Sequence, residues 1–476
     1  MWKLRKTAAP LGCLAALLAA PAMAADAFLP STLLFNNETG VDQTISSAGP
    51  IPLSNPFFMS LGGNGRACVT CHQPSAGWTV TPANVQARFD ATGGTDPIFR
   101  TNDGSVSPDA DVSTVAARRK AYAMLLTKAL IRVGIGVPAN AEFDLVAVDD
   151  PYGHASASDL SLFRRVLPST NLGFVSTVMW DGRETFKDAT TTDCLMGTTS
   201  CFAPIHFDLG DQASGATTGH AQAPAAPTAD ELDAIVAFEA SLTTAQVYDD
   251  SAGALHVHNA QGGPRHLAHQ PFYFGINDVL ARDYRTGAAF NPTIFTLYDT
   301  WAKEGTRSKD EGLHPGQKAR ASVYRGQQIF NTRRIRITGV GGLNDDLNVP
   351  EIDGTCGTCH DAPGAGSHSV PAPLDIGIAD ASRRTPDMPL YTLRHKVAPY
   401  EVVQTTDPGR ALISGAWKDI GRFKGPVLRA LASRPPYFHN GSAKDLAAVV
   451  DFYDQRFTIG LSDQDKRDLV AFLRTL

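Results

Sequence analysis

Two short stretches of this chain carry the residue types of one kind of redox chemistry. Cys68-Val-Thr-Cys71-His72 and Cys356-Gly-Thr-Cys359-His360 each place a histidine directly after two closely spaced cysteines. Two thiols about one helical turn apart can form thioethers to both vinyl groups of one porphyrin, and the histidine then lies under the iron as its axial ligand. A single CxxC pair also fits a redox dithiol or half a zinc site. The repeat of the whole pattern favours two covalently attached haem c groups, with His72 and His360 as iron ligands.

The first 24 residues have the features of a cleaved export signal. A basic start is followed by an apolar run over residues 11–20 that is too short to span a bilayer, and Ala22-Met23-Ala24 has the form of a signal-peptidase site. We expect cleavage after Ala24 and a location in the periplasm, because c-type haem is attached outside the cytoplasmic membrane. The alternative is an uncleaved anchor. No later stretch is long and apolar enough to be transmembrane.

The length and the charge of the chain limit further which class of protein it can be. A chain of 476 residues has room for two or three domains with cores of their own. Its 42 glycines and 31 prolines suit a protein whose loops surround cofactors. Loss of residues 1–24 would remove three basic and no acidic residues and take the formal net charge from −6 to −9. This balance argues against nucleic acid as a partner.

Two cysteines of the mature chain lie outside the haem motifs. Cys194 and Cys201 close a short loop, and in an oxidising compartment a disulfide between them is the expected state. A metal site or a redox pair stays open as an alternative, but neighbouring residues offer no further ligands.

The hydrophobic pattern predicts helices at 116–133, 230–242 and 465–476, and helical structure again over 310–330. The helix at 230–242 and the helix at 465–476 have matching apolar positions, and each follows one haem motif. We interpret this as an internal duplication. Residues 25–60 are expected to be an extended lead-in and residues 134–160 a loop. The predicted fold class is mainly α: two cytochrome c-type haem domains packed face to face, with loop-rich insertions.

The expected domain organisation follows from this pattern. After the signal peptide at 1–24, an N-terminal haem domain spans 25–250, a connector spans 251–312, and a C-terminal haem domain spans 313–476. The connector contains four histidines, His256, His258, His266 and His269, in a stretch rich in Gly, Pro and Gln. Because their spacing fits no metal site, we expect a solvated connector.

Three further stretches narrow the family. Met179-Trp180-Asp181-Gly182-Arg183 lies in the first half, while residues 425–441, which include Pro436-Tyr-Phe-His-Asn-Gly441, and residues 446–453 lie near the end. Together with the two CxxCH motifs, in this order, they resemble the bacterial dihaem cytochrome c peroxidase family, which includes MauG. The resemblance covers most of the mature chain apart from the connector and residues 85–160.

This resemblance implies roles for several residues. The N-terminal haem would bind peroxide, and the C-terminal haem would exchange electrons with it through Trp180, whose indole can be oxidised transiently. The alternative for Trp180 is a plain core tryptophan. The sixth ligand of the second haem would be Tyr453, a hard oxygen donor that stabilises ferric and higher iron states. The alternative is that Tyr453 only packs on its helix and that Met388 or a histidine binds the iron.

The residues opposite His72 depart from the family pattern. Gln212 fits a family glutamine, but the position of the family's acid/base glutamate falls on Gln222, which cannot take up a proton. His220, two residues earlier, carries an imidazole that can take up and release a proton, so we expect it to act as the acid/base, or as a sixth ligand displaced on activation. The alternative is a surface histidine in a Gly/Ala/Thr loop.

The family also binds calcium between its domains. Arg434 and Pro436 could supply carbonyl ligands, but the family's asparagine position reads as Val166, with Asn171 nearby. A calcium ion therefore stays an open option beside the two haems.

Taken together, the resemblance implies a periplasmic dihaem peroxidase. It would reduce hydrogen peroxide with His220 assisting, and take electrons from a small periplasmic donor such as a cytochrome c or a cupredoxin. Two alternatives remain: a MauG-like enzyme that oxidises Trp or Tyr side chains of a partner protein, and a dihaem cytochrome that only transfers electrons.

Overall fold

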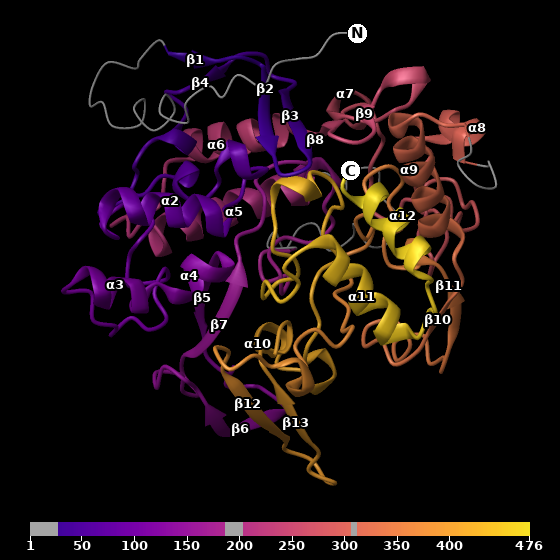
Figure 1. Cartoon of the computed structure of the whole chain (residues 1–476). Helices are drawn as coiled ribbons and strands as arrows, with labels where there is room; N and C mark the ends of the chain where they lie inside the picture. Colours follow the sequence, from indigo (N-terminus) through magenta and orange to yellow (C-terminus); the bar gives the residue numbers. More distant parts are fainter. Residues whose placement is uncertain (1–26, 186–202, 306–311) are drawn as a thin grey trace.

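The computed structural model describes residues 27–185, 203–305 and 312–476. The expected signal peptide and the expected Cys194–Cys201 disulfide lie outside the described residues. In Figure 1 the N-terminal half, indigo to magenta, occupies the left side of the molecule, and the C-terminal half, orange to yellow, occupies the right. Within the described residues no helix is long and apolar enough to cross a membrane.

The expected mainly α fold is wrong, because the molecule is mixed α/β. Helices make up 32% of the chain and strands 18%, and the strands form several small sheets. One sheet has the order β2-β3-β8-β9, a second has the order β13-β12-β6, and three are two-stranded pairs, β1-β4, β5-β7 and β10-β11. The strands are β1 (Phe28–Leu29), β2 (Thr32–Asn37), β3 (Gly40–Ser46), β4 (Ile51–Pro52), β5 (Leu130–Ile135), β6 (Phe143–Asp149), β7 (Leu160–Arg165), β8 (Leu242–Asp249), β9 (Gly253–Ala254), β10 (Ile335–Ile337), β11 (Ile352–Gly354), β12 (Leu390–His395) and β13 (Val402–Thr405).

Most of the helices lie between the small sheets at the upper and lower ends of the molecule, with α9, α11 and α12 on the right beside β10 and β11 (Figure 1). The predicted helices at 230–242 and 465–476 are confirmed as α6 and α12, and the helical restart near residue 315 is confirmed as α9. The helices are α2 (Pro82–Thr92), α3 (Val115–Ala121), α4 (Ala123–Lys128), α5 (Ala203–Gly219), α6 (Ala229–Ser241), α7 (Pro264–Leu267), α8 (Ala302–Gly305), α9 (Pro315–Thr332), α10 (Ala411–Ser414), α11 (Leu446–Phe457) and α12 (Asp463–Leu473).

Two of the missed strands have partners that are far away in sequence, whereas β2 and β3 form a local hairpin that the sequence analysis overlooked. The expected lead-in contains β3, which pairs antiparallel with β8, about two hundred residues later. The expected loop at 134–160 contains β6, which pairs with β12 of the C-terminal half (Figure 1). Local periodicity does not reveal such pairs, since strand stability depends mainly on cross-strand and same-face neighbours. The predicted helix at 116–133 ends earlier than expected because β5 begins at Leu130 and pairs with β7.

Each haem motif packs against its own closing helix. Ile235 and Phe238 of α6 share a hydrophobic cluster with Cys68, while Leu469 and Phe472 of α12 share one with Cys356. The two helices also begin alike, since Thr228 and Ser462 cap them by accepting hydrogen bonds from backbone N–H groups three residues later. These equivalent arrangements are compatible with the internal duplication, which stays a prediction.

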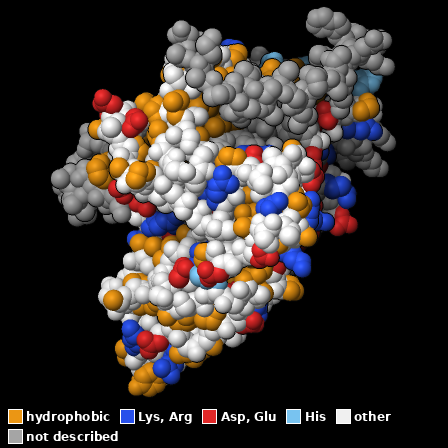
Figure 2. Space-filling model, turned by 90° about the vertical axis from the view of Figure 1, so that its left-hand side faces the viewer, with side chains coloured by type: hydrophobic (Ala, Val, Ile, Leu, Met, Phe, Trp, Pro, Cys, Tyr) orange, Lys and Arg blue, Asp and Glu red, His pale blue; other side chains and the backbone are white. Residues whose placement is uncertain are grey.

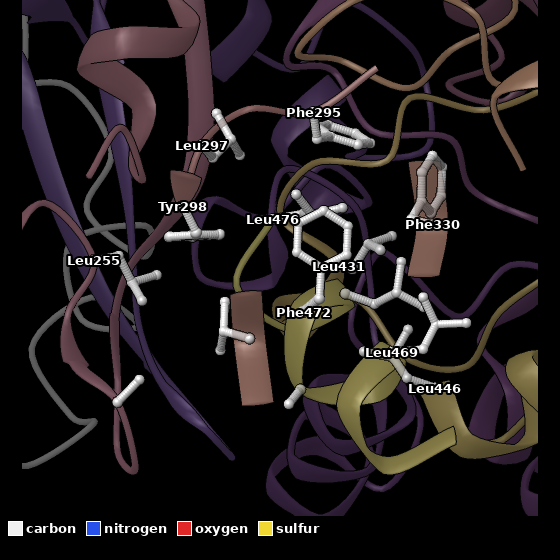
Figure 3. Close-up of a cluster of buried hydrophobic side chains, with 14 of the residues drawn as sticks. Leu255, Phe295, Leu297, Tyr298, Phe330, Leu431, Leu446, Leu469, Phe472 and Leu476 are labelled. Carbon is white, nitrogen blue, oxygen red and sulfur yellow. The ribbon is translucent and has the colours of Figure 1, made fainter. Parts of the chain in front are cut away.

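The largest apolar cluster lies in the C-terminal half (Figure 3). It joins residues of α9 and α12 to chain that we expected to be a solvated connector. That expectation is wrong along the segment, because Leu255 near its beginning, Leu267 in its middle and Phe295 near its end are almost completely buried. Tyr298 and Trp301 are buried as well. The histidine-rich beginning of this segment drew attention to polar residues, whereas its aromatic end supplies apolar area to the second haem domain.

The lower end of the molecule exposes a mixed surface of apolar and charged side chains (Figure 2). Val397, Tyr400 and Val402 on and beside the turn between β12 and β13 are more than half exposed.

The crossing of α9 and α12 depends on a glycine. An added Cβ at Gly326 would lie 2.0 Å from the carbonyl oxygen of Asp468 and 2.6 Å from the Cβ of Phe472. We therefore expect Gly326→Ala to force the helices apart and to lower the free energy of unfolding by about 1–3 kcal/mol. Denaturant unfolding of the holoprotein measures this loss.

Gly316→Ala is the matched control in the same helix. Its added Cβ would have only ordinary contacts, the nearest 3.6 Å away at Arg320. It should leave stability unchanged or raise it by up to about 1 kcal/mol, because alanine favours the helix. Equal effects of the two substitutions would contradict the close-crossing argument.

Candidate functional site

The two CxxCH motifs line two separate cavities that share one wall. The first cavity contains Cys68, Cys71 and His72, and encloses about 1730 Å³ including space open to solvent. The second contains Cys356, Cys359 and His360, and encloses about 1800 Å³ on the same measure. Both cavities are lined by Arg165, Val166, Pro168, Trp180, Lys424, Pro426 and Arg434.

The same local turn presents both motifs. Each begins with a short 3-10 helix, at Cys68–Thr70 and at Cys356–Thr358. The hydroxyls of Thr70 and Thr358 accept hydrogen bonds, each of 3.0 Å, from the backbone N–H of the residue before the first cysteine. The backbone N–H of each motif histidine donates to the carbonyl of that cysteine. Cysteines and histidine therefore leave one tight turn together.

Both motif histidines are prepared to bind a metal through Nε2. Nδ1 of His72 lies 3.2 Å from the carbonyl oxygen of Trp78, and Nδ1 of His360 lies 2.8 Å from that of Gly366. Because a carbonyl can only accept, Nδ1 carries the proton in each ring and Nε2 keeps its lone pair. Burial lowers the pKa of both histidines to about 4, which favours the neutral imidazole that a metal requires.

The donor set fits haem better than zinc or a redox dithiol. Among the described residues, no group of three or more His, Cys, Asp and Glu side chains could hold a metal ion. Burial raises the pKa of the Cys68, Cys356 and Cys359 thiols to about 12, whereas a reactive dithiol needs a lowered pKa. Two thiols, one imidazole and a large apolar cavity match haem c at both sites.

Trp180 lies in the wall between the cavities. Its indole Nε1 donates to the carbonyl of Arg165 at 2.8 Å, and its own carbonyl accepts from the backbone N–H of Lys424. The next residue, Asp181, is fully buried between the guanidinium groups of Arg164 and Arg183. The Trp-Asp-Gly-Arg stretch therefore fixes the indole at a position that contacts both cavities.

One face of α5 brings Gln212 and His220 to the first cavity. Gln212, Ala213, Ala216 and Thr217 line it at helical spacing, and His220 lines it directly after the helix ends. Gln222 does not line the cavity, and its side chain accepts a hydrogen bond from Asn64 instead. His220 is thus the titratable group that this segment presents at the position where the family pattern places a glutamate.

Sequence reasoning missed the acidic partner of His220. Nδ1 of His220 lies 2.5 Å from Oδ2 of Asp103, and Arg66 contacts the other oxygen of that carboxylate at 2.6 Å. Burial opposes ionisation of Asp103, yet hydrogen bonds and charge from His220 and Arg66 hold its pKa below the usual range. This carboxylate fixes the histidine ring with Nε2 free. Asp103 lies in the part of the chain that the family resemblance does not cover, and no nearby motif pointed to it.

Sequence reasoning also missed Ser169 and Glu239, which are linked to His72 by hydrogen bonds. The hydroxyl of Ser169 lies 2.8 Å from Nδ1 of His72, and Glu239 of α6 forms a hydrogen bond with Ser169. Burial raises the pKa of Glu239 to about 7. Groups of this kind orient an iron-binding imidazole and tune its basicity.

The second cavity brings Tyr453 together with His360 and excludes Met388. Tyr453 lines that cavity, and burial raises the pKa of its phenol. Met388 instead packs in a cluster with Met124 and other residues that include no part of a haem motif. His439 also lines the second cavity, is buried, and has no hydrogen-bond partner for either ring nitrogen. Tyr453 and His439 therefore remain as candidate iron ligands.

The expected calcium ligands are occupied by other contacts. The carbonyl oxygen of Arg434 accepts a hydrogen bond of 3.3 Å from the guanidinium of Arg165. The side-chain amide of Asn171 both donates to and accepts from the backbone of Thr244. A calcium ion here would have to displace a cation and break strand contacts.

Comparison with known proteins supports the resemblance inferred from the motifs. The chain is 31% identical over 140 residues to cytochrome-c peroxidase IdrP1 of Pseudomonas sp. (strain SCT), and 35% identical over 137 residues to cytochrome-c peroxidase IdrP2 of Denitromonas iodatirespirans. The matches cover 25% and 26% of this chain and 36% of each relative, so the chain spans just over a third of the relatives it matches. The resemblance to cytochrome c peroxidases is thereby confirmed for that part.

Two other comparisons give no further support for the resemblance to cytochrome c peroxidases. No family model matches the chain. A solved structure titled as a MauG-like protein associated with microbial copper homeostasis aligns over 88% of this chain and 87% of its own, with 15% identity and a TM-score of 0.34. A similarity this loose carries no conclusion about fold or activity.

The two cavities predict independent haem attachment. The double variant Cys68→Ala/Cys71→Ala should lose one haem and keep the other, and Cys356→Ala/Cys359→Ala should do the same for the second site. Intact mass and haem absorbance of the purified protein measure the stoichiometry. A protein that carries one haem before any substitution, or none, would contradict the assignment of two haem c sites.

Proposed function

We propose that this protein is a periplasmic dihaem enzyme that reduces hydrogen peroxide. The observation that carries the proposal is the pair of CxxCH cavities sharing a wall that contains Trp180. Similarity to proteins named cytochrome-c peroxidase supports the reaction class. Export to the periplasm agrees with covalent haem and with residues 1–24 of the sequence. The electron donor would be a small periplasmic cytochrome c or cupredoxin.

The haems would supply the redox chemistry, and the chain would supply positioning and proton transfer. His72 and His360 are the proposed iron ligands, held through Nδ1 by backbone carbonyls. In the first cavity the free Nε2 of His220 would hold or deliver a proton, while Asp103 fixes the tautomer of the ring. Gln212 on the same helix face would orient peroxide by hydrogen bonding.

Electron transfer between the two sites would pass through Trp180. An indole anchored at Nε1 and packed between two cavities offers a fixed aromatic group in the intervening wall. Its edge-to-face contact with His439, with ring centroids 6.3 Å apart, extends aromatic side chains toward the second cavity.

A second candidate function rests on Tyr453. A tyrosinate ligand would stabilise oxidised iron at the second haem and favour oxidation of Trp or Tyr side chains on a partner protein. The position of Tyr453 in the His360 cavity is compatible with that role. The two functions differ in the reductant: a small redox protein in the first case, a protein side chain in the second.

His220 should be required for peroxide turnover. We expect His220→Ala to slow peroxide consumption, measured with a reduced small cytochrome c, by about 10²- to 10⁴-fold, because the proton-transfer group is lost. Asp103→Asn should slow it by about 10- to 100-fold and alter the pH profile, since the ring loses its orienting carboxylate.

The matched control is His206→Ala, because His206 is an exposed histidine on the same helix. It should retain full turnover. If the loaded protein consumes no peroxide, the enzymatic proposal fails. If His220→Ala turns over normally, another group transfers the proton.

Tyr453 should set the potential of the second haem. Replacing it by methionine, Tyr453→Met, should raise that haem's midpoint potential, because a thioether stabilises ferrous iron better than a phenolate does. Tyr437→Phe is the control, since Tyr437 lines the same cavity but donates its hydroxyl to the carbonyl of Leu431. Spectroscopic redox titration of both haems gives the values. An unchanged potential in Tyr453→Met would leave His439 as the candidate ligand.

A further inference from the structure

Four cationic side chains around the shared wall have no acidic partner among the residues that the structure describes. Arg165, Lys424 and Arg429 are buried and Arg434 is partly buried, and all four line the first cavity. Within the described residues their side chains form no ion pair with Asp or Glu. Their printed hydrogen bonds all go to backbone carbonyls: Arg165 to Lys128, Ala129 and Arg434; Lys424 to Thr177; Arg429 to Gly364 and Gly263; Arg434 to Val427 and Arg429.

These contacts leave part of the hydrogen-bonding capacity unused. Nε of Arg429 and Nε of Arg434 are buried without a partner. Burial lowers the pKa of Lys424 to about 8 and that of Arg434 to about 10, and neighbouring positive charge adds to the effect at Lys424. Burying unpaired cations costs free energy. A cluster of four buried cations therefore indicates that anions bind in the cavities.

Arg164, the neighbour of Arg165, shows how the protein compensates a buried charge with its own carboxylates. Arg164 is equally buried but pairs with Asp181 at 2.5 Å and with Asp407 at 2.7 Å. Its neighbour Arg165, one position along β7, contacts no carboxylate. Arg164 lines only the first cavity, whereas Arg165 lines the cavities on both sides of the wall.

We propose that Arg165, Lys424, Arg429 and Arg434 form one carboxylate-binding site that holds the propionate groups of both haems. This inference rests on the proposed function, because it requires that the protein binds two haems. A haem anchored through its vinyl groups at the CxxC turn directs its opposite edge, which bears two propionates, away from the cysteines. Two haems supply four carboxylates for four cations, and guanidinium groups bind carboxylates in a bidentate manner.

The site is asymmetric, and this makes it testable. Arg165, Lys424 and Arg434 line both cavities, whereas Arg429 lines the first cavity alone. A cation near a haem raises its midpoint potential by stabilising the reduced form. Lys424→Met should therefore lower the potentials of both haems, while Arg429→Met should lower that of the His72 haem only.

The experiment compares these variants with Lys444→Met, an exposed lysine far less able to affect the haems. Intact mass first establishes two haems in each holoprotein. Redox titration then gives both potentials, and resonance Raman spectra report the propionate bending bands. We expect the bands of both haems to shift in Lys424→Met and not in Lys444→Met, and Lys424→Arg to restore both readouts because it keeps the charge.

Two further measurements separate the outcomes. In the unaltered holoprotein the bending bands should have the frequencies of hydrogen-bonded propionates, which needs no variant to fold, and added formate should leave them unchanged. A shift with formate would mean that the cations bind free anions instead. If two haems are present but Lys424→Met behaves like Lys444→Met, this inference is wrong and the proposed function stands. If the unaltered protein holds fewer than two haems, both fail.

Discussion

Compensation of buried charge is the constraint on which the centre of this molecule depends. The strand β7 is buried along its whole length, and its last two residues are both arginines. Arg164 is neutralised inside the protein by Asp181 and Asp407, and this pairing holds the chain on either side of Trp180 in place. Arg165 carries its charge into the wall between the cavities with only carbonyl partners. The polypeptide thus neutralises Arg164 with its own carboxylates. It leaves Arg165 to be neutralised by groups bound in the cavities.

Backbone hydrogen bonds join the two halves of the chain on either side of this wall. Strand β6 of the first half pairs with β12 of the second, and the carbonyl of Leu476 accepts hydrogen bonds from Gln246 and Ala430. A hinge between the halves would break these backbone hydrogen bonds. Each unit keeps the same turn and closing helix, while the connections between units fix the distance across the wall. A fixed distance is what electron transfer between two cofactors requires.

Local features of the site could be predicted from the sequence, but few of the contacts between residues far apart in the chain could be. Both CxxCH turns and the two closing helices follow from motifs or periodicity within a short window, and the cavity positions of Trp180 and Tyr453 follow from the family resemblance. Asp103 could not be predicted, because its importance arises only when α5, over a hundred residues later, brings His220 to it. The pairing of β3 with β8 and of β6 with β12 was missed for the same reason, whereas the hairpin of β2 and β3 is local and was overlooked. What local patterns encode was predictable, and what long-range pairing creates was not.

The same segment that attaches the first haem also positions the group proposed to handle its protons. Arg66 stands two residues before Cys68, and its guanidinium contacts the carboxylate of Asp103 and the backbone carbonyl of His220. Asn64, just upstream, donates to that same carbonyl at 2.8 Å. The histidine ring and the haem-attachment turn are therefore fixed to one short piece of chain. The proton transfer proposed for His220 requires its ring to be held in one orientation, and Asp103 and Arg66 hold it.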